Sequence, residues 1–272
     1  MNRTVRTTLS MTLPLTLLLL AGCDNGEPEP MKSPPVRDPG QEPVSGADAG
    51  TSEGSSASTE LARDDAAFLE RLGLIRGHLH AGHALYTDGK PAMAETHMKH
   101  PRDELYAGLV PAIEARGFTP FDAELTALKS AVDAGAPSDE VTTAWREVDG
   151  AIERLERATD ATAQEELLAI AAMLDTAAEE YGIGVVDGVV DNVHEYQDAW
   201  GFSQVALERV GQIASTTDVE RQATAEAAVA ISSLEDLWPN LDPKVRLGTR
   251  EERIADAADR VRSLARSIGE PG

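Results

Sequence analysis

The sequence is short of cysteine, of aromatic side chains and of positive charge. Its 272 residues include one Cys, 4% aromatics, and 24 Lys+Arg against 47 Asp+Glu, which gives a formal net charge of −23. A single Cys excludes a disulfide framework and a thiolate zinc ribbon. A chain this acidic has no clustered basic surface to displace counterions from phosphates, so we expect no nucleic-acid partner.

The chain also lacks the usual signs of a hydrolytic enzyme. It has no Gly-x-Ser-x-Gly elbow, and its one thiol is that of Cys23, close to the N-terminus. Hydrophobic residues make up 42% of the chain, enough for a core built from Ala, Leu and Val. We therefore expect one domain, or two small ones, without catalytic activity.

The first residues have the pattern of an export signal. Arg3 and Arg6 precede the mostly apolar run from Leu9 to Ala21, which is too short to span a bilayer comfortably. The run ends in Leu20-Ala21-Gly22-Cys23, which resembles a bacterial lipoprotein signal. The resemblance implies that residues 1–22 are a removed signal peptide and that Cys23 is lipidated. The alternative is a plain secretory signal with an incidental Cys, which differs only in the anchor.

The lipoprotein resemblance also implies a location. The membrane partner would be reached through the lipid, with the protein on the periplasmic side of a bacterial membrane. Asp24 follows the lipidated position and resembles the inner-membrane retention signal of enterobacterial lipoproteins, which favours the inner membrane. Residues 23–59 are rich in Pro, Gly, Ser and acids, and they predict a disordered tether because they cannot bury enough apolar surface to offset chain entropy.

Helical patterns begin after the tether. Val141, Val148 and Ile152 keep an apolar stripe at helical spacing, and Ile170 and Leu174 belong to a second stripe. Thr217 and Glu220 are spaced as a capping box. No comparable run of alternating β-branched residues occurs. Residues 60–272 therefore predict an all-α bundle of about seven to nine helices, with a possible subdivision near residue 136.

Five of the six histidines lie close together. They are His78, His80, His83, His97 and His100. The surrounding sequence predicts a helical hairpin that turns at Thr87 to Lys90, with Pro101 starting a further helix. On that hairpin His80 and His83 share one face, His97 and His100 share another, and the two pairs can converge.

Converging imidazoles suit a transition metal such as zinc, copper or iron. The predicted ligands are His80, His83, His97, His100 and Glu104, and the secondary candidates from this hairpin are His78, Glu95, Met93 and Met98. The two thioethers would favour copper if they pointed inward. The alternative is that these histidines are surface or capping residues and that the methionines belong to the core.

A second region gives a family resemblance. Tyr181 is followed by Val185-Val186-Asp187-Gly188, then by Glu195-Tyr196-Gln197-Asp198, and then by Phe202. This pattern resembles the periplasmic extension of bacterial iron permeases of the high-affinity ferric type. The resemblance implies a role with iron and an envelope metal transporter as partner. No transmembrane transport helices follow, so the chain is not expected to be the channel itself.

The same region offers oxygen ligands. The spacing predicts Asp191, Glu195 and Asp198 on one helix face, with Glu179 on the preceding helix, as further secondary metal ligands. The alternative is a solvated acidic face. His194 lies beside this face, but on a helix it projects about 100° from Glu195, so we expect only one of the two to point inward.

Two functions of different classes follow from these patterns. The first is a membrane-anchored periplasmic lipoprotein that binds a transition metal, with iron favoured, for acquisition, storage or delivery. The second is a non-catalytic helical scaffold that docks to an envelope partner. The position of the histidine side chains separates them, because only the first function needs the rings to meet at one point.

Overall fold

The structure is a computed structural model, and it describes residues 59–244, 246–247 and 251–269. In chain order its elements are α2 (Asp65–Thr87), α3 (Pro91–Pro101), the π-helix η1 (Arg102–Tyr106), α4 (Ala107–Ala115), α5 (Asp122–Asp133), α6 (Ser138–Ala158), α7 (Ala163–Gly184), β1 (Val185–Val186), β2 (Val189–Val190), α8 (Val193–Val210), α9 (Asp218–Ser232), the 3-10 helix η2 (Glu235–Leu237) and α10 (Glu251–Gly269). The all-α prediction is confirmed. The predicted signal peptide, and all but the last residue of the predicted tether, lie outside the described residues.

Side-chain caps define several helix starts. Thr217 accepts a hydrogen bond from the Glu220 backbone N–H, and the Glu220 carboxylate accepts one from the Thr217 N–H, so the predicted capping box forms. Thr162 and Glu165 form a second capping box at the start of α7, which the sequence analysis did not predict. Each box satisfies backbone donors that a helix leaves free in its first turn.

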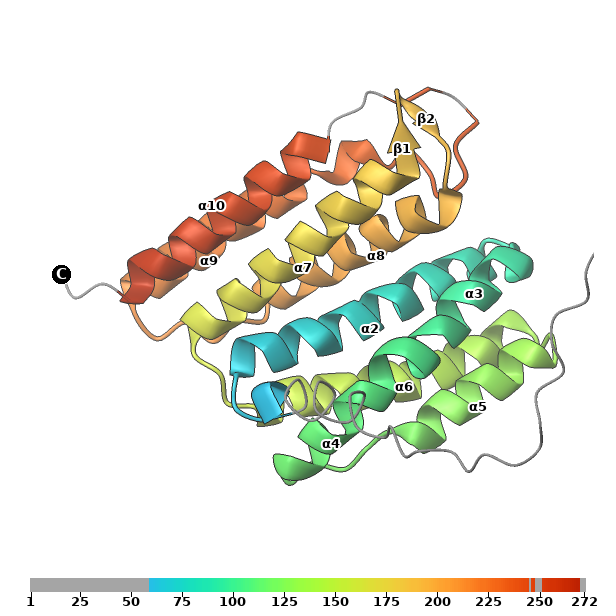
Figure 1. Cartoon of the computed structure of the whole chain (residues 1–272), viewed down its shortest axis with the longest axis horizontal. Helices are drawn as coiled ribbons and strands as arrows, with labels where there is room; N and C mark the ends of the chain where they lie inside the picture. The colour runs from blue at the N-terminus through green and yellow to red at the C-terminus, as the bar shows by residue number, and fades with distance from the viewer. Residues whose placement is uncertain (1–58, 245, 248–250, 270–272) are drawn as a thin grey trace, which may run out of the picture. The chain divides into compact units, whose positions relative to one another are not determined.

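The buried apolar side chains form two cores. The first is built from α2 to α6 and includes Val148 and Ile152, while the second is built mainly from α7 to α10 and includes Ile170 and Leu174. Figure 1 shows α7 to α10 lying side by side, with α2 between this group and α3 to α6. The predicted apolar stripes of α6 and α7 are thus confirmed as core. Apart from Leu74 of α2, which packs in the second core, the buried residues of the two cores divide between residues 155 and 167. The predicted subdivision near residue 136 stays a prediction.

The backbones of α2 and α8 pack against each other without intervening side chains. A methyl group on Gly201 would overlap the carbonyl oxygen of Gly77, and a methyl group on Gly77 would overlap the Phe202 ring. Glycine at both positions therefore permits an approach that any larger residue would prevent. This close crossing brings the neighbouring residues His78 and Asp198 toward one another.

The connections around the site differ in part from expectation. The hairpin of α2 and α3 forms as predicted, with Gly89 at φ 74° in its turn. Pro101 does not start a separate helix, because α3 continues through it into η1 and α4. Between α7 and α8 the chain forms a two-stranded hairpin that was not predicted, with Asp187 and Gly188 both at positive φ, as a type I′ turn requires.

None of the helices in the described part of the chain is both long enough and apolar enough to cross a membrane.

Candidate metal centre

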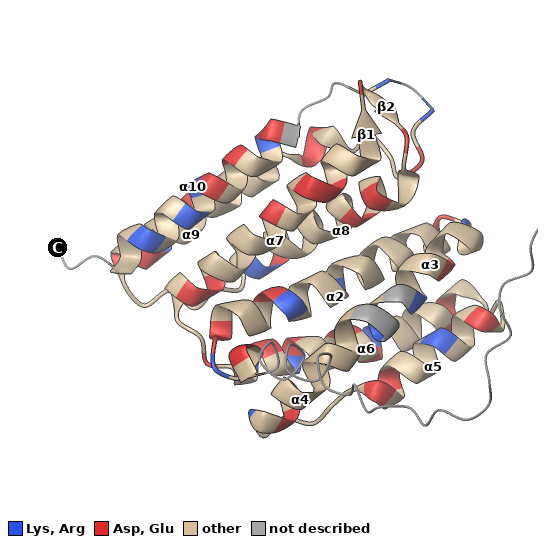
Figure 2. Ribbon diagram, in the orientation of Figure 1, with Lys and Arg blue, Asp and Glu red and all other residues tan. Residues whose placement is uncertain are grey.

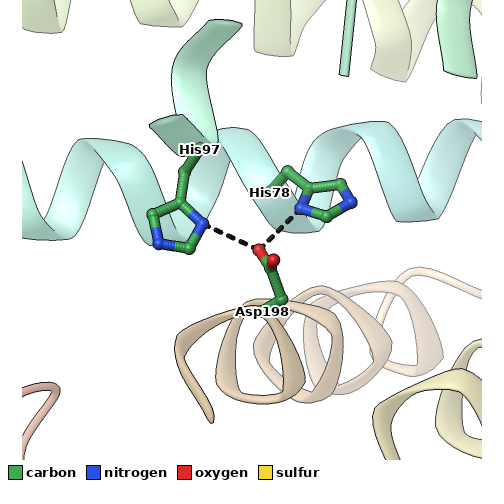
Figure 3. A group of neighbouring side chains, drawn as sticks. All are labelled: His78, His97 and Asp198. Carbon is green, nitrogen blue, oxygen red and sulfur yellow. Dashed lines mark hydrogen bonds and ion pairs between the residues drawn. The ribbon is translucent and has the colours of Figure 1, made fainter. Parts of the chain in front are cut away.

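Three helices bring two imidazoles and a carboxylate together. His78 on α2 places Nδ1 2.6 Å from Oδ1 of Asp198 on α8, and His97 on α3 places its Nδ1 2.8 Å from the same oxygen. Figure 3 shows both rings directed at this carboxylate. The three ligand atoms lie within 4.8 Å of one another. The cluster joins residues more than 100 positions apart in the chain and depends on the packing of α2, α3 and α8.

The His97 ring is held at both of its nitrogens. The amide nitrogen of Gln197 donates to the Leu241 carbonyl, so the Gln197 side-chain oxygen faces Nε2 of His97, 2.8 Å away. Both ring nitrogens of His97 therefore face an oxygen atom, Oδ1 of Asp198 on one side and the Gln197 side-chain oxygen on the other. The neighbouring residue Tyr196 holds the same segment, because its hydroxyl donates to the carbonyl of Asn240. Orientation of this kind is what a ligand ring needs from the residues behind it.

Burial sets the electrostatics of the centre. The Asp198 side chain is 1% exposed and that of His97 is 0% exposed. Burial alone would raise the pKa of Asp198, but the hydrogen bonds and charges of His78 and His97 outweigh it and hold that pKa well below its usual range. Asp198 is therefore a carboxylate, and its negative charge lies in a part of the protein that water does not reach.

A more exposed group adjoins the buried one. Nδ1 of His194 lies 3.2 Å from Oδ2 of Asp198 and 3.5 Å from Oε2 of Glu195, and the side chains of His194 and Glu195 are 25% and 27% exposed. The His194 ring stacks on the His97 ring, with centroids 4.2 Å apart and planes 3° from parallel. His194 and Glu195 therefore both approach Asp198, contrary to the expectation that only one of them points inward.

Glu180 of α7 completes this outer group. Burial, a hydrogen bond to Glu195 and the charges of Glu195, Asp198 and Glu179 all raise the pKa of Glu180. Figure 2 shows acidic segments on α7 and α8 toward the ends that adjoin the β1–β2 hairpin. Acidic side chains of two helices thus meet above the buried centre, where like charges repel unless a proton or a cation lies between them.

His80 and His83 do not belong to the centre. The His80 ring lies against Trp145 and Trp200, with centroids 6.2 and 5.3 Å away, and His83 stacks on Trp145 at 4.0 Å while Nε2 lies 3.0 Å from the Thr142 hydroxyl. Burial lowers the pKa of His80 to about 4, so its ring is neutral. His83 faces α6, whereas His80 lies between Trp145 of α6 and Trp200 of α8, away from Asp198. The structure thus pairs His97 with His78, a secondary candidate, instead of with His80 and His83.

The other hairpin candidates are also dispersed. The side chains of His100 and Glu104 lie outside what the structure describes. Met98 is 2% exposed and packs in the first core, where Met93 is partly buried, so neither thioether is placed at the centre. Glu95 is exposed and forms an ion pair with Lys99. The described part of the hairpin therefore contributes nitrogen ligands and no sulfur ligand.

The predicted acidic face forms only in part. Asp191 is exposed and precedes α8, because Asn192 caps the helix by accepting from the His194 N–H. Asp191 therefore does not share the helix face with Glu195 and Asp198. Glu179 is exposed on α7, whereas Glu195 and Asp198 both belong to candidate ligand groups.

Two members of the centre were missed or set aside from sequence. Gln197 lies between Tyr196 and Asp198, where the permease-like pattern gives no reason to expect a functional residue, and the step of about 100° between neighbouring helix residues argues against His194 and Glu195 sharing a face. The useful signal was that pattern itself, because it ends at Asp198. For His78, the neighbouring Gly77 is the sequence feature that points to its position, because small residues mark the helix face that approaches another backbone.

A comparison with protein families concerns the second half of the described chain. Residues 159–270 match the family model of the iron permease-associated 4-helix bundle domain. The match covers α7 to α10, fewer than half of the 272 residues, and it includes Asp198, His194 and Glu195 but neither His78 nor His97. It supports the permease resemblance of residues 181–202 and a role related to iron permeases. Comparisons with curated proteins and with solved structures find no match.

Proposed function

We propose that this protein is a periplasmic iron-binding lipoprotein that holds iron for an envelope permease. The observation that carries the proposal is the buried set of His78, His97 and Asp198, joined through α8 to the permease-associated domain. Two imidazoles and one carboxylate are the donor set typical of non-haem ferrous sites. A metal ion would compete with protons for the ring nitrogens that now face Asp198.

The same donors argue against cuprous copper as the natural cargo. Cuprous ion prefers thiolate and thioether ligands, and Met93 and Met98 lie in the first core instead. Zinc accepts imidazole and carboxylate as readily as iron does, so the binding test includes both ions. In this proposal the metal is cargo and no reaction is catalysed, which agrees with the lack of a nucleophile motif in the sequence.

The sequence supplies the location in this proposal. Lipid on Cys23 would hold the protein on the periplasmic side of the membrane, and Asp24 favours the inner membrane, where a permease lies. In this proposal the tether predicted for residues 23–59 links the lipid to the helical domain. An acidic protein is not drawn onto an anionic membrane surface, so attachment would depend on the acyl chains.

A second candidate is a docking scaffold without metal. The observation that favours it is the apolar surface around the β1–β2 hairpin, where Ile183, Val186 and Val189 are 55%, 50% and 45% exposed. Isolated exposed apolar residues are common, but three near one hairpin suit contact with another protein. This function requires no bound iron, so the same binding experiment separates the two candidates.

Asp198→Asn tests the iron-binding proposal. Anaerobic equilibrium dialysis against ferrous, zinc and cuprous ions should show tight ferrous binding by the natural protein and a loss of at least about 100-fold in affinity in the variant, because an amide gives the metal no negative charge. Two controls should bind iron like the natural protein: Asp191→Asn, an exposed acid of the same segment, and His83→Gln, a ligand predicted from sequence. Absence of iron binding by the natural protein would leave only the scaffold.

A further inference from the structure

Asp198 has two oxygens, and each faces a different pair of donors. Oδ1 lies 2.6 and 2.8 Å from the Nδ1 atoms of His78 and His97, whereas Oδ2 faces Nδ1 of His194 at 3.2 Å, with Glu195 beside it. We propose that Asp198 bridges two metal ions, one held with His78 and His97 and the other held with His194 and Glu195. The inference rests on the proposed function, because its first ion is the iron proposed above.

The buried carboxylate itself supports a second position. Oδ2 of Asp198 is buried and accepts no hydrogen bond of acceptable geometry from the described residues, although the side chain is only 1% exposed. An ionised carboxylate can accept at both oxygens, and leaving one of them without a donor inside a protein is unfavourable. A cation beside Oδ2 would remove that penalty.

The rings are arranged to serve both oxygens. His97 and His194 stack with their planes 3° apart, and each directs its Nδ1 at a different oxygen of the same carboxylate. Glu195 lies in the same group as His194, with all ligand atoms of that group within 4.8 Å of one another. Two ligand groups that share one carboxylate are the arrangement that a bridged pair of ions requires.

The charges around the second position are also suitable. Glu195 and Asp198 contribute to it directly, and the carboxyl group of Glu180 is within hydrogen-bonding reach of Glu195. The position that the His194 imidazole faces thus adjoins two carboxylates, and Glu180 adds a third acidic group beside Glu195. Carboxylates and imidazole together suit a divalent transition ion such as ferrous iron or manganese.

The two positions differ in access. The outer pair, His194 and Glu195, is 25% and 27% exposed, while His97 and Asp198 are almost fully buried. The outer ion would therefore exchange with solvent, and the inner ion would be shielded from it. An ion that enters from solvent meets the outer ligands first, so the outer position also serves as the entrance to the inner one.

Metal stoichiometry tests the bridge in the full-length chain. With ferrous iron in excess under anaerobic conditions, we expect two ions per natural protein, one per Glu195→Gln protein and none per Asp198→Asn protein. Glu95→Gln, an exposed glutamate on α3, should still bind two. One ion in the natural protein, unchanged in Glu195→Gln, would overturn the second site and leave the proposed function intact. No iron in the natural protein would overturn both.

Manganese(II) provides the spectroscopic test of bridging. At saturation, electron paramagnetic resonance of the natural protein should show a spin-coupled pair, and Glu195→Gln should show the signal of an isolated ion. Two bound ions with isolated signals would overturn the bridge through Asp198. Glu195 is partly exposed, and matching thermal unfolding of the metal-free proteins would show that the variant is folded.

Discussion

Two clusters of ionisable side chains share helix α2, and they are built around different basic residues. In the first, Arg76 is 4% exposed and lies 2.6 Å from Asp149, 3.2 Å from Glu153 and 3.2 Å from Glu208. In the second, two residues further along α2, His78 shares the carboxylate of Asp198 with His97. Both clusters tie α2 to α8.

The two clusters differ in whether the basic side chain can release a proton. A guanidinium keeps its protons under all ordinary conditions and has no lone pair to offer, so the Arg76 cluster can only hold helices together. An imidazole can lose a proton and then donate a lone pair to a metal ion. The first cluster can therefore act only as a structural link between helices, whereas the proposed function requires the second to exchange a proton for a metal ion.

The largest expected effect comes from removing the cation of the first cluster. Arg76→Met should lower the free energy of unfolding by about 3–5 kcal/mol, because the partly buried Asp149 would lose its partner and the buried Glu156 would keep only Arg209 as a counter-charge. Urea denaturation of the metal-free protein measures this loss.

Arg157→Met is the matched control for that variant. Arg157 also pairs with Glu153, but its side chain is 64% exposed, so its loss should lower the free energy of unfolding by about 1 kcal/mol or less. If the two variants lost equal free energy of unfolding, the buried position of Arg76 would not be what makes its ion pairs stabilising.

A smaller loss of stability, with a loss of binding, is expected at the crossing of α2 and α8. Gly201→Ala should lower the free energy of unfolding by about 1–3 kcal/mol, since the added methyl group meets the Gly77 carbonyl. It should also weaken ferrous binding by about 10- to 100-fold, because α2 and α8 carry His78 and Asp198 and would be pushed apart. Calorimetric titration together with urea denaturation measures both effects.

Gly108→Ala is the control for the crossing. Gly108 lies in α4, with nothing within 4 Å of the position that a methyl group would take. Alanine there should raise the free energy of unfolding by about 0.5–1 kcal/mol and leave iron binding unchanged. If Gly201→Ala bound iron as well as Gly108→Ala does, the close crossing would not be what positions the ligands.

The smallest expected effect concerns pH and Glu156. Burial raises the pKa of Glu156 above its ordinary value of 4.5, although Arg209 and Arg76 lower it. A pKa raised by folding means that the favourable contribution of the neutral acid is complete below about pH 4.5 and is lost as pH rises through the folded-state pKa.

Glu156→Gln should remove this pH dependence, because glutamine is neutral throughout. The natural protein should therefore lose stability relative to the variant as pH rises above about 4.5, as measured by urea denaturation at each pH. A constant difference across that range would show that the two arginines compensate fully for the burial of Glu156.

Sequence patterns predicted the architecture better than the site. Apolar spacing identified the stripes of α6 and α7, and the Glu-Tyr-x-Asp pattern pointed to α8, because both signals are local. The choice between His78 and His80 was not local. The choice depended on which face of α2 meets α8. The glycines at the crossing turn the face that carries His78 toward α8, whereas the face that carries His83 packs on Trp145 of α6.

The position at which α8 begins limited the prediction of acidic ligands on that helix. Asp191 has the right spacing to share a face with Glu195 and Asp198, but the Asn192 cap begins α8 after it. Similarly, the carboxyl group of Glu180 reaches Glu195 only because the β1–β2 hairpin folds α7 back along α8. Periodicity along one helix carries no information about such contacts between helices.

The position of iron in the protein tests the central claim most directly. Crystals grown with ferrous iron under anaerobic conditions, measured on both sides of the iron absorption edge, should show an anomalous scattering peak bounded by His78, His97 and Asp198. A peak elsewhere, or iron found only on surface carboxylates while these three side chains keep their hydrogen bonds, would contradict the claim.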